Sequence, residues 1–579
     1  MKFSRPIAIL AGTIALAAIF ASLRPLRVQA GSLRPNPLDA TFARLRALEG
    51  KLRKSAILGG GAQGLFHLAN NWDKLKARSA NLHHASPQLS SASQLPPGQI
   101  TAPPSTGPTA INPSLFRGFL MNGSTTAWCG NNAVVVYNDM ESESDSFFST
   151  TTSDRESDLG YSVSANRGAT FTDMGFVPLP TEPAILGLDP DVTCTSAKNF
   201  YISSLYNSVT QNAVAVSTST DGGQTFGPPQ VASGASNTGH FFDADWIAAN
   251  PANPNQLFIS FVNAEFTFGV CPGGLGFSIE VVNSNDAGNT WSSPVTVADE
   301  VCLDDASPIK GVVNIPKIAV DPRGTEVYVT WEKFGVGSLD REVDISHATI
   351  PSTPSPIPLA LSFSSPAKVS SMFFAGTLDG PTFGSANGQT MVQLLPGRIM
   401  TLERPQLAIG KGPQNKGVLY VTWTGGANAI PDGHTDFYVF TDILVTSSRD
   451  GGNTWTTPAR VNNNPEDGTT HPFTDQFHPA IATDRTGAIA ICFYDRRNDP
   501  LNFLIGRYCA VSFNGKNWAN FPIDPKGGPS VVNQDDFALP DWQGDYETLA
   551  ADGLGIIPGF LGGYTDSSAG YQNIRRNRF

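Results

Sequence analysis

The chain has 579 residues and a net charge of −12, and only 15% of its residues are charged. This length is enough for one large domain or several smaller ones with a sizeable core. The 56 glycines and 44 prolines favour many tight turns and argue against a protein built from long helices.

Residues 1–30 are typical of a secretory signal. Lys2 and Arg5 precede the apolar run 7–23, and a small-residue cleavage pattern ends at Ala30. We therefore expect cleavage after Ala30 and a protein that is secreted, periplasmic or held at the cell surface. An uncleaved membrane anchor is the alternative, although the apolar run is near the short limit for a span.

Residues 31–81 form a basic segment with nine Lys and Arg against three acids, a net charge of +6. Four apolar residues fall at helical spacing and predict a helix: Leu38, Phe42, Leu45 and Leu52. We interpret the segment as a partly helical pro-segment or surface helix. The alternative is a basic amphipathic helix that binds a partner or contacts a membrane through residues 38–56.

The next stretch, residues 82–115, is rich in Ser, Pro, Thr and Gln and has too little apolar content to form a core. It predicts a linker. The signal (+4) and the basic segment (+6) together leave a charge of −22 for the rest of the chain. Such an acidic body argues against nucleic acid as a partner, because phosphates would be repelled.

Short apolar runs that end in an aromatic and a polar residue recur about every 71 residues. Runs of β-branched and aromatic residues between turn residues mark antiparallel hairpins. Repeated β units bury themselves by stacking on neighbours, and radial stacking produces a β-propeller. The seven runs predict an all-β chain with seven blades over residues 116–579, with six blades as the alternative, and strands near 111–127 would close the ring. The runs are AVVVYND (133–139), ISSLYNS (202–208), FISFVNA (258–264), VYVTWEK (327–333), LYVTWTG (419–425), IAICFYD (489–495) and FLGGYTD (560–566).

A second repeat is a turn of the form Ser-x-Asp-x-Gly-x-Thr-Trp/Phe. The polar side chain accepts bonds from backbone N–H groups, the glycine supplies positive φ, and the aromatic residue returns to the core. A reduced copy occurs at 512–518, and the fourth unit has none. The pattern resembles the Asp-box (BNR-repeat) turns of sialidase-like propellers, and the resemblance spans about residues 118–579. Its structural polar residues are Asn166, Asp221, Asp286 and Asp450.

The resemblance implies a glycoside hydrolase of the exo-sialidase type, with its site on the face opposite the Asp-boxes. Such a site needs three arginines for the substrate carboxylate, an Asp acid/base and a Tyr activated by a Glu. A third arginine would be Arg117 or Arg575. The candidate catalytic residues are Arg404, Arg496, Tyr564, Glu332 and Asp139, and the candidate ligand-binding residues are Arg497, His478, Asp245 and Asp495.

Acidic residues at the starts of the predicted inner strands weaken the sialidase interpretation. They would repel an anionic sugar and suit a neutral glycan, a cationic ligand or a bound cation better. A non-catalytic propeller that binds a glycan or protein at the cell surface is the alternative function. We expect a monomer that needs no metal or cofactor; a calcium ion is compatible with the aspartates, but no ligand pattern indicates one. The acidic residues at the starts of the predicted inner strands are Asp189, Asp191, Asp243, Asp245 and Asp545.

The six cysteines show no close Cys-x-x-Cys or Cys/His spacing of a zinc site. In an exported protein they favour disulfides, with buried thiols as the alternative. Position along the predicted blades suggests the pairs Cys129–Cys194, Cys271–Cys302 and Cys492–Cys509.

Overall fold

The computed structural model describes most of the propeller and two N-terminal pieces. The predicted signal, Arg117, Cys271 and Asp545 lie outside the described residues. The described residues are 38–52, 66, 69–74, 93–95, 97–101, 121–139, 157–180, 182–236, 239–265, 276–302, 311–335, 341–352, 358–372, 385–386, 389–390, 393–396, 399–401, 404–431, 437–528, 546–566 and 573–579.

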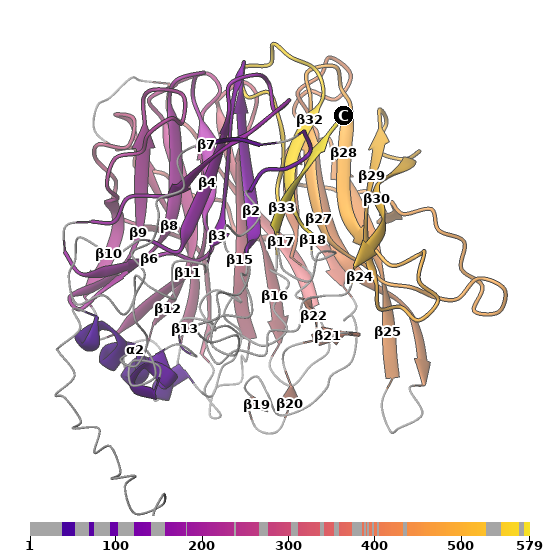
Figure 1. Ribbon diagram of the computed structural model, residues 1–579, viewed down its shortest axis with the longest axis horizontal. Helices are drawn as coiled ribbons and strands as arrows, with labels where there is room; N and C mark the ends of the chain where they lie inside the picture. Colours follow the sequence, from indigo (N-terminus) through magenta and orange to yellow (C-terminus); the bar gives the residue numbers. More distant parts are fainter. Residues whose placement is uncertain are drawn as a thin grey trace, which may run out of the picture.

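Seven antiparallel sheets stand around a common axis, which confirms the predicted seven-bladed propeller (Figure 1). The seven apolar runs of the sequence repeat all lie in the second strand of a blade, and we call the residue at the aromatic position of each run its marker residue. Blades 1 to 4 contain β2 (Met121–Cys129), β3 (Asn132–Asp139), β4 (Leu159–Ser164), β5 (Thr172–Phe176); β6 (Ala184–Leu186), β7 (Asp191–Cys194), β8 (Phe200–Ser208), β9 (Gln211–Ser219), β10 (Gln230–Ser236); β11 (His240–Ala249), β12 (Leu257–Glu265), β13 (Gly276–Ser284), β14 (Val295–Cys302); and β15 (Gly311–Val320), β16 (Glu326–Gly335), β17 (Arg341–Thr349), β18 (Ala367–Met372).

The remaining blades follow the same order from the axis outward. Blades 5 to 7 contain β23 (Gln406–Ile409), β24 (Leu419–Pro431), β25 (Phe437–Ser448), β26 (Ala459–Arg460); β27 (Gln476–Thr483), β28 (Ile489–Asp495), β29 (Ile505–Ser512), β30 (Ala519–Gly528); and β31 (Leu549–Ala551), β32 (Phe560–Asp566), β33 (Asn573–Arg578). A short strand, β1 (Ser93–Gln94), is added to the outer edge of blade 1. Outside the blades lie α2 (Asp39–Leu52), β19 (Ser385–Ala386), β20 (Gln389–Thr390), β21 (Gln393–Leu395) and β22 (Ile399–Thr401).

The second strands are apolar at nearly every position because both of their faces pack against neighbouring blades. Every residue of β8 and of β28 is buried. Trp331 and Trp423, the marker residues of blades 4 and 5, are among the largest fully buried side chains. Burying an aliphatic or aromatic side chain stabilises the fold by roughly 1.5–3 kcal/mol, so the interfaces between blades hold the ring together.

Residues from the predicted linker close the ring. The Ile100 N–H donates to the Ile574 carbonyl at 3.1 Å, and the Arg576 N–H donates to the Gly98 carbonyl at 3.1 Å. Residues 97–101 thereby cover the outer edge of the three-stranded blade 7, and β1 covers the edge of β5 in blade 1. The expectation that residues 111–127 complete the last blade was wrong, because β2 is the innermost strand of blade 1. Covering exposed strand edges in this way prevents edge-to-edge pairing.

The four repeated turns share one hydrogen-bond pattern. The serine hydroxyl accepts the N–H of the glycine four residues later at 2.9 Å in every copy. The Asp450 carboxylate accepts from the Thr454 N–H at 2.9 Å and from its hydroxyl. These turns join the third and fourth strands, so they lie on one face of the ring, which we call the turn face. The second-to-third loops lie on the opposite face, which we call the loop face.

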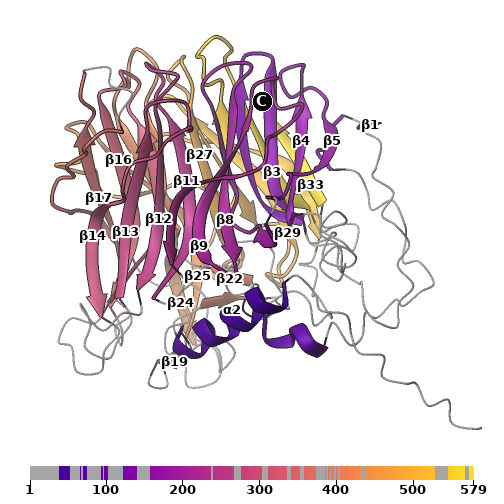
Figure 2. The same ribbon diagram turned by 90° about the vertical axis from the view of Figure 1, so that its left-hand side faces the viewer.

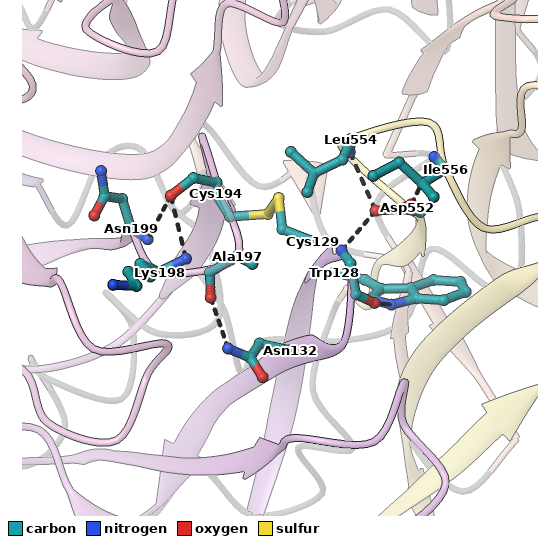
Figure 3. Close-up of a disulfide and its surroundings, with 12 residues drawn as sticks. Trp128, Cys129, Asn132, Cys194, Ala197, Lys198, Asn199, Asp552, Leu554 and Ile556 are labelled. Atoms are coloured by element: carbon teal, nitrogen blue, oxygen red, sulfur yellow. Dashed lines mark hydrogen bonds between the residues drawn. A yellow bond between two sulfur atoms is a disulfide. The ribbon is translucent and has the colours of Figure 1, made fainter.

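Two of the three predicted disulfides are confirmed. Cys129–Cys194 joins blades 1 and 2, and Cys492–Cys509 joins the adjacent strands β28 and β29. Beside the first, the Asp552 carboxylate of blade 7 accepts the Gly130 N–H at 2.8 Å (Figure 3). The bridge is therefore part of the junction where the ring closes. These disulfides are compatible with a secreted protein, and the Cys271–Cys302 pair stays a prediction.

The helix α2 lies at the loop face, at the same end of the blades as β19–β22 (Figures 1 and 2). Its apolar stripe of Leu38, Phe42, Leu45 and Leu48 is buried in the cluster that includes residues of blades 2 and 3. Leu38, Phe42 and Leu45 of the predicted stripe thus face the propeller, and the side chain of Leu52 lies outside what the structure describes. Among the described helices, none is long and apolar enough to cross a membrane.

Candidate active site at one end of the axis

The innermost strands share a kink near the loop face. In blades 1, 3, 4 and 6 the pairing register with the second strand shifts at the kink. A left-handed backbone costs about 1–2 kcal/mol at a residue other than glycine. Such bulges re-aim side chains and gather at functional sites. The left-handed residues, with φ between 47° and 61°, are Gly123, Asp189, Ala244, Ile315, Arg404 and His478.

Residues at or just after these kinks, together with Tyr546 of blade 7, form a group around the axis, which we call the axial cluster. The Lys317 Nζ lies 3.1 Å from the centre of the Trp246 ring, and the Trp246 and Tyr546 rings are 5.0 Å apart. The Arg404 guanidinium lies 6.0 Å from the Tyr546 ring. Blades 3, 4, 5 and 7 therefore meet here. The members of the axial cluster are Asp191, Asp245, Trp246, Lys317, Arg404 and Tyr546.

Blade 2 joins the axial cluster through Asp191. Its Oδ2 accepts the N–H of Ile247 at 3.0 Å. Burial raises the pKa of Asp191 to about 6, although the Lys317 charge and that backbone N–H oppose the rise. The same buried surroundings lower the pKa of Lys317 to about 8, against the attraction of Asp191. Each charge therefore opposes the effect of burial on the other group.

Asp245 has a different environment. Its side chain is 1% exposed, and among the described residues no donor lies within hydrogen-bonding geometry of either carboxylate oxygen. Burial raises its pKa well above the ordinary value; the negative charges of Asp191 and Asp243 raise it further, and the Ser203 hydroxyl lowers it in part. Two neighbouring carboxyl groups thus differ in proton affinity, which is the arrangement that assigns an acid and a base.

A second buried group lies between blades 6 and 7. The Tyr494 hydroxyl donates to Glu547, whose other oxygen lies 2.8 Å from Arg507 Nη2. The Thr565 N–H also donates to Glu547, at 2.7 Å. Burial and the Glu547 charge raise the pKa of Tyr494 well above its ordinary value. The His478 ring, one of the predicted ligand-binding groups, lies 6.1 Å from the Tyr494 ring.

Arg496 occupies a structural position in blade 6. Its Nη1 lies 3.6 Å from Asp475, and it donates to the carbonyls of Asn502 at 2.9 Å and Pro396 at 2.6 Å. The side chains of Arg496 and Asp475 are fully buried. Asp475 also accepts the N–H of Thr441 at 3.1 Å. The guanidinium is therefore occupied by contacts within the protein.

Two further predicted binding residues pair with each other. Arg497 Nη2 lies 2.6 Å from Asp495, and its guanidinium stacks 4.2 Å from the centre of the Tyr508 ring. Tyr508 belongs to the third strand of blade 6, away from the innermost strand. The structure thus places this pair outside the axial cluster.

The other candidate catalytic residues lie in separate blades. Glu332 is fully buried in blade 4 and pairs with Arg341 at 2.9 Å. Asp139 ends the second strand of blade 1. Tyr564 is buried in blade 7, and burial raises its pKa above the ordinary value. Arg404 alone among the candidate catalytic residues belongs to the axial cluster, together with Asp245 from the predicted ligand-binding set.

Sequence reasoning did not single out Trp246, Tyr546, Tyr494 or Glu547. A usable signal exists for the axial residues. Several innermost strands carry a short stretch with polar residues at the kink, such as DADW at 243–246 in β11 and NIPK at 314–317 in β15. Aligning these stretches places Trp246 and Lys317 two residues after the left-handed residue of their blades, in the same position as Asp191 in blade 2.

In the described part of the chain, no group of three His, Cys, Asp or Glu residues lies close enough to hold a metal ion.

Comparisons with known proteins do not show a family for this chain. No family model matches it, and no curated protein matches it. Among solved structures it is similar to the Hadza microbial sialidase Hz136, with 11% identity, a TM-score of 0.38 and coverage of 72% of this chain and 79% of that one. It is also similar to the Penicillium chrysogenum α-L-arabinanase complexed with arabinobiose, with 9% identity, a TM-score of 0.40 and coverage of 84% and 98%. A third is an ulvan lyase of polysaccharide lyase family PL25, with 10% identity, a TM-score of 0.38 and coverage of 80% and 95%. Similarity at this level does not carry an activity from one chain to another.

Proposed function

We propose that the protein is a secreted glycoside hydrolase that acts on a neutral glycan at the axial cluster. The observation that supports this most is the difference between Asp191 and Asp245. The Lys317 charge lowers the pKa of Asp191 in part, whereas burial and two negative charges raise the pKa of Asp245 well above its ordinary value, so Asp245 is the group that favours its proton. Hydrolysis of a glycosidic bond uses such a pair, one carboxylic acid and one carboxylate.

The roles follow from the proton affinities. Asp245 donates its proton to the glycosidic oxygen as the bond breaks. Asp191 acts on the opposite side of the sugar, as the base that activates water or as the nucleophile. The rings of Trp246 and Tyr546 supply the flat apolar surface against which a sugar ring packs. The acidic surroundings favour a substrate without charge.

The test is hydrolysis of a panel of fluorogenic neutral glycosides and plant and microbial polysaccharides, with a fluorogenic sialoside beside it. Turnover of a neutral substrate that is lost in Asp191→Asn and in Asp245→Asn is the expected result. Binding of a glycan without turnover, by folded protein, would instead favour the non-catalytic propeller. No binding and no turnover on any substrate would sink the proposal.

A second candidate, the exo-sialidase, has one observation in its favour. The hydrogen bond between Tyr494 and Glu547 is the kind of Tyr/Glu pair that such a mechanism needs. Of the arginines that would bind the substrate carboxylate, Arg404 lies in the axial cluster and Arg507 is paired with Glu547. Turnover of the sialoside that is lost in Tyr494→Phe and kept in Asp245→Asn would favour this candidate over the neutral-glycan hydrolase.

The pH dependence of activity should respond to Lys317. Because Asp191 must be ionised, kcat/KM rises with pH through its pKa of about 6. In Lys317→Met the burial of Asp191 remains but the opposing positive charge is gone, so this limb should move to higher pH by about one unit. The control is Lys333→Met, which removes a partly exposed lysine 3.8 Å from Glu342. A pH profile unchanged in Lys317→Met would contradict the role given to Asp191.

A further inference from the structure

The N-terminal helical segment is a separate unit at the loop face. It comprises residues 38–52, 66 and 69–74, which we call the cap. Within it the Phe42 and Trp72 rings stack 4.2 Å apart, and the Trp72 Nε1–H donates to Asp39 at 2.8 Å. Arg46 pairs with Asp73 at 3.0 Å. These contacts hold α2 against the residues that follow it, so the cap has an internal structure of its own.

The cap is seated on blades 2 and 3. The Phe66 and Phe241 rings are 4.9 Å apart, and Arg44 Nη2 donates to the Asn212 side chain at 2.9 Å. Burial lowers the pKa of Arg44 to about 10, so this guanidinium has lost much of its water. Asn212 follows the second-to-third turn of blade 2, and Phe241 stands two residues before Asp243. The cap therefore covers the loop face beside the axial cluster.

One apolar cluster runs from the cap into the site. It joins the stripe of α2 to Leu188 and Ala244, which neighbour the acidic kink residues, and continues to Trp246 and Tyr546. The carboxyl groups proposed to contact a substrate are almost fully buried: Asp191 is 5% exposed and Asp245 is 1% exposed. A glycan chain can reach these carboxyl groups only if part of the loop face opens.

The order of the elements along the chain allows the cap to be removed without disrupting the propeller. Residues 97–101, which close blade 7, come after the cap in the chain, and a single connection over residues 75–92 joins the two. Loss of the cap would leave all seven blades and the ring closure in place. The insertion with β21 and β22, by contrast, is fixed at both ends, between β18 and β23.

We propose that the cap is an inhibitory pro-segment, which closes the loop face over the axial cluster and whose release opens the site. The charges fit this role: the whole basic segment that contains the cap, residues 31–81, carries +6 and the rest of the chain after the signal carries −22, so their attraction favours the seated segment and is weakened by salt. The inference rests on the axial cluster as the site of the proposed function. When the open form is a small fraction of the protein, apparent substrate affinity is reduced by that fraction.

The test cuts the chain only after it has folded. A specific protease site is engineered between Arg78 and Ser93 of the full-length protein, in the wild-type background and with Arg44→Ala and Phe66→Ala to weaken the seat. Ala43→Ser, on the exposed side of α2, is the matched control. After cutting, size-exclusion chromatography in salt follows the cap fragment. Carbodiimide with an amine nucleophile, read by mass spectrometry, follows the accessibility of Asp191 and Asp245.

The expected result is that the fragment leaves the weakened variant first and that labelling of the two carboxyl groups then rises about tenfold or more. Labelling that stays unchanged after the fragment has left would overturn the proposal, and so would a fragment that never leaves the cut, weakened variant. Turnover on the glycan panel is recorded in parallel. If the fragment is released and labelling rises but no substrate is turned over, the proposal of an inhibitory cap stands and the proposed hydrolase function is rejected. If turnover is equal before and after release, only the proposal of an inhibitory cap is rejected.

Discussion

An Asp245→Asn variant is expected to lose turnover by about 10²–10⁴-fold and, at pH 7, to be more stable than the wild type. The first effect follows from the role proposed for Asp245 as the proton donor, because an amide of the same shape has no acidic proton to give. Asn also keeps the volume of the side chain, so the neighbouring Trp246 and Tyr546 rings should hold their positions. Steady-state kinetics on the neutral substrate measures the loss.

The gain in stability follows from the proton that folding must bind. The unfolded chain has Asp245 ionised above its ordinary pKa of 3.8, whereas in the folded protein burial raises that pKa well above it. A raised pKa contributes stability that is present below pH 3.8 and is lost as the pH rises toward the folded value. The Asn variant has no such loss. Its free energy of unfolding should exceed that of the wild type at pH 7, by about 1.4 kcal/mol for each unit by which the folded pKa lies above 3.8, and match it near pH 4.

The matched control is Asp450→Asn, the same chemical change in a turn on the opposite face. Hydrogen bonds from Thr454 and Ser448 lower the pKa of Asp450 to about 2, so the sign reverses and the variant should be slightly less stable at pH 7. Asn166 holds the equivalent turn of blade 1, so the substitution fits. Turnover of this variant should be unchanged. Wild-type turnover in Asp245→Asn, or a loss of stability equal to that of the control, would contradict the assignment.

The fold could be predicted from the sequence because each repeat is a short, contiguous stretch of residues. A strand buried on both faces must be apolar at nearly every position, and the runs that end at Tyr137 or Trp423 mark a second strand in each blade. The tight turn needs a glycine with positive φ and a side-chain acceptor, so the same sequence motif occurs four times. Ring closure by residues 97–101 has no such signal, because their pairing with blade 7 spans more than 470 residues and one short edge strand has no distinctive pattern.

The site was harder to predict for the same physical reason. Axial side chains come from different blades, and their pairing depends on the angle at which each kinked strand delivers them. Arg496 is conspicuous in the sequence beside Arg497, yet it has buried partners in blade 6. Trp246 and Lys317 are 71 positions apart, and nothing in either stretch alone indicates their 3.1 Å contact. The kink repeats from blade to blade, whereas the side chain that follows it differs in each blade, so the repeat does not indicate which side chains meet at the axis.

An Arg496→Met variant should lose about 3–5 kcal/mol of folding stability, the usual cost of removing one partner from a buried ion pair. The loss arises because Asp475 stays buried without the arginine that stabilises its charge. Burial already raises the pKa of Asp475, and Arg496 is the largest influence that lowers it. Without Arg496 the pKa rises further, so the variant should lose more stability at pH 8 than at pH 5. Chemical denaturation at the two pH values measures both effects.

Two variants separate this structural role from the arginine of a sialidase site. Asp475→Asn combined with Arg496→Met removes both charges and should recover part of the stability, since an unpaired buried charge costs more than none. Arg575→Met removes another arginine considered for the substrate carboxylate, 3.1 Å from Asp566 but 37% exposed, and should cost less than about 1 kcal/mol. If Arg496 instead bound a substrate carboxylate, Arg496→Met would keep its stability and raise KM for the sialoside. Stability and KM therefore give opposite answers, and the buried pair with Asp475 favours the loss of stability.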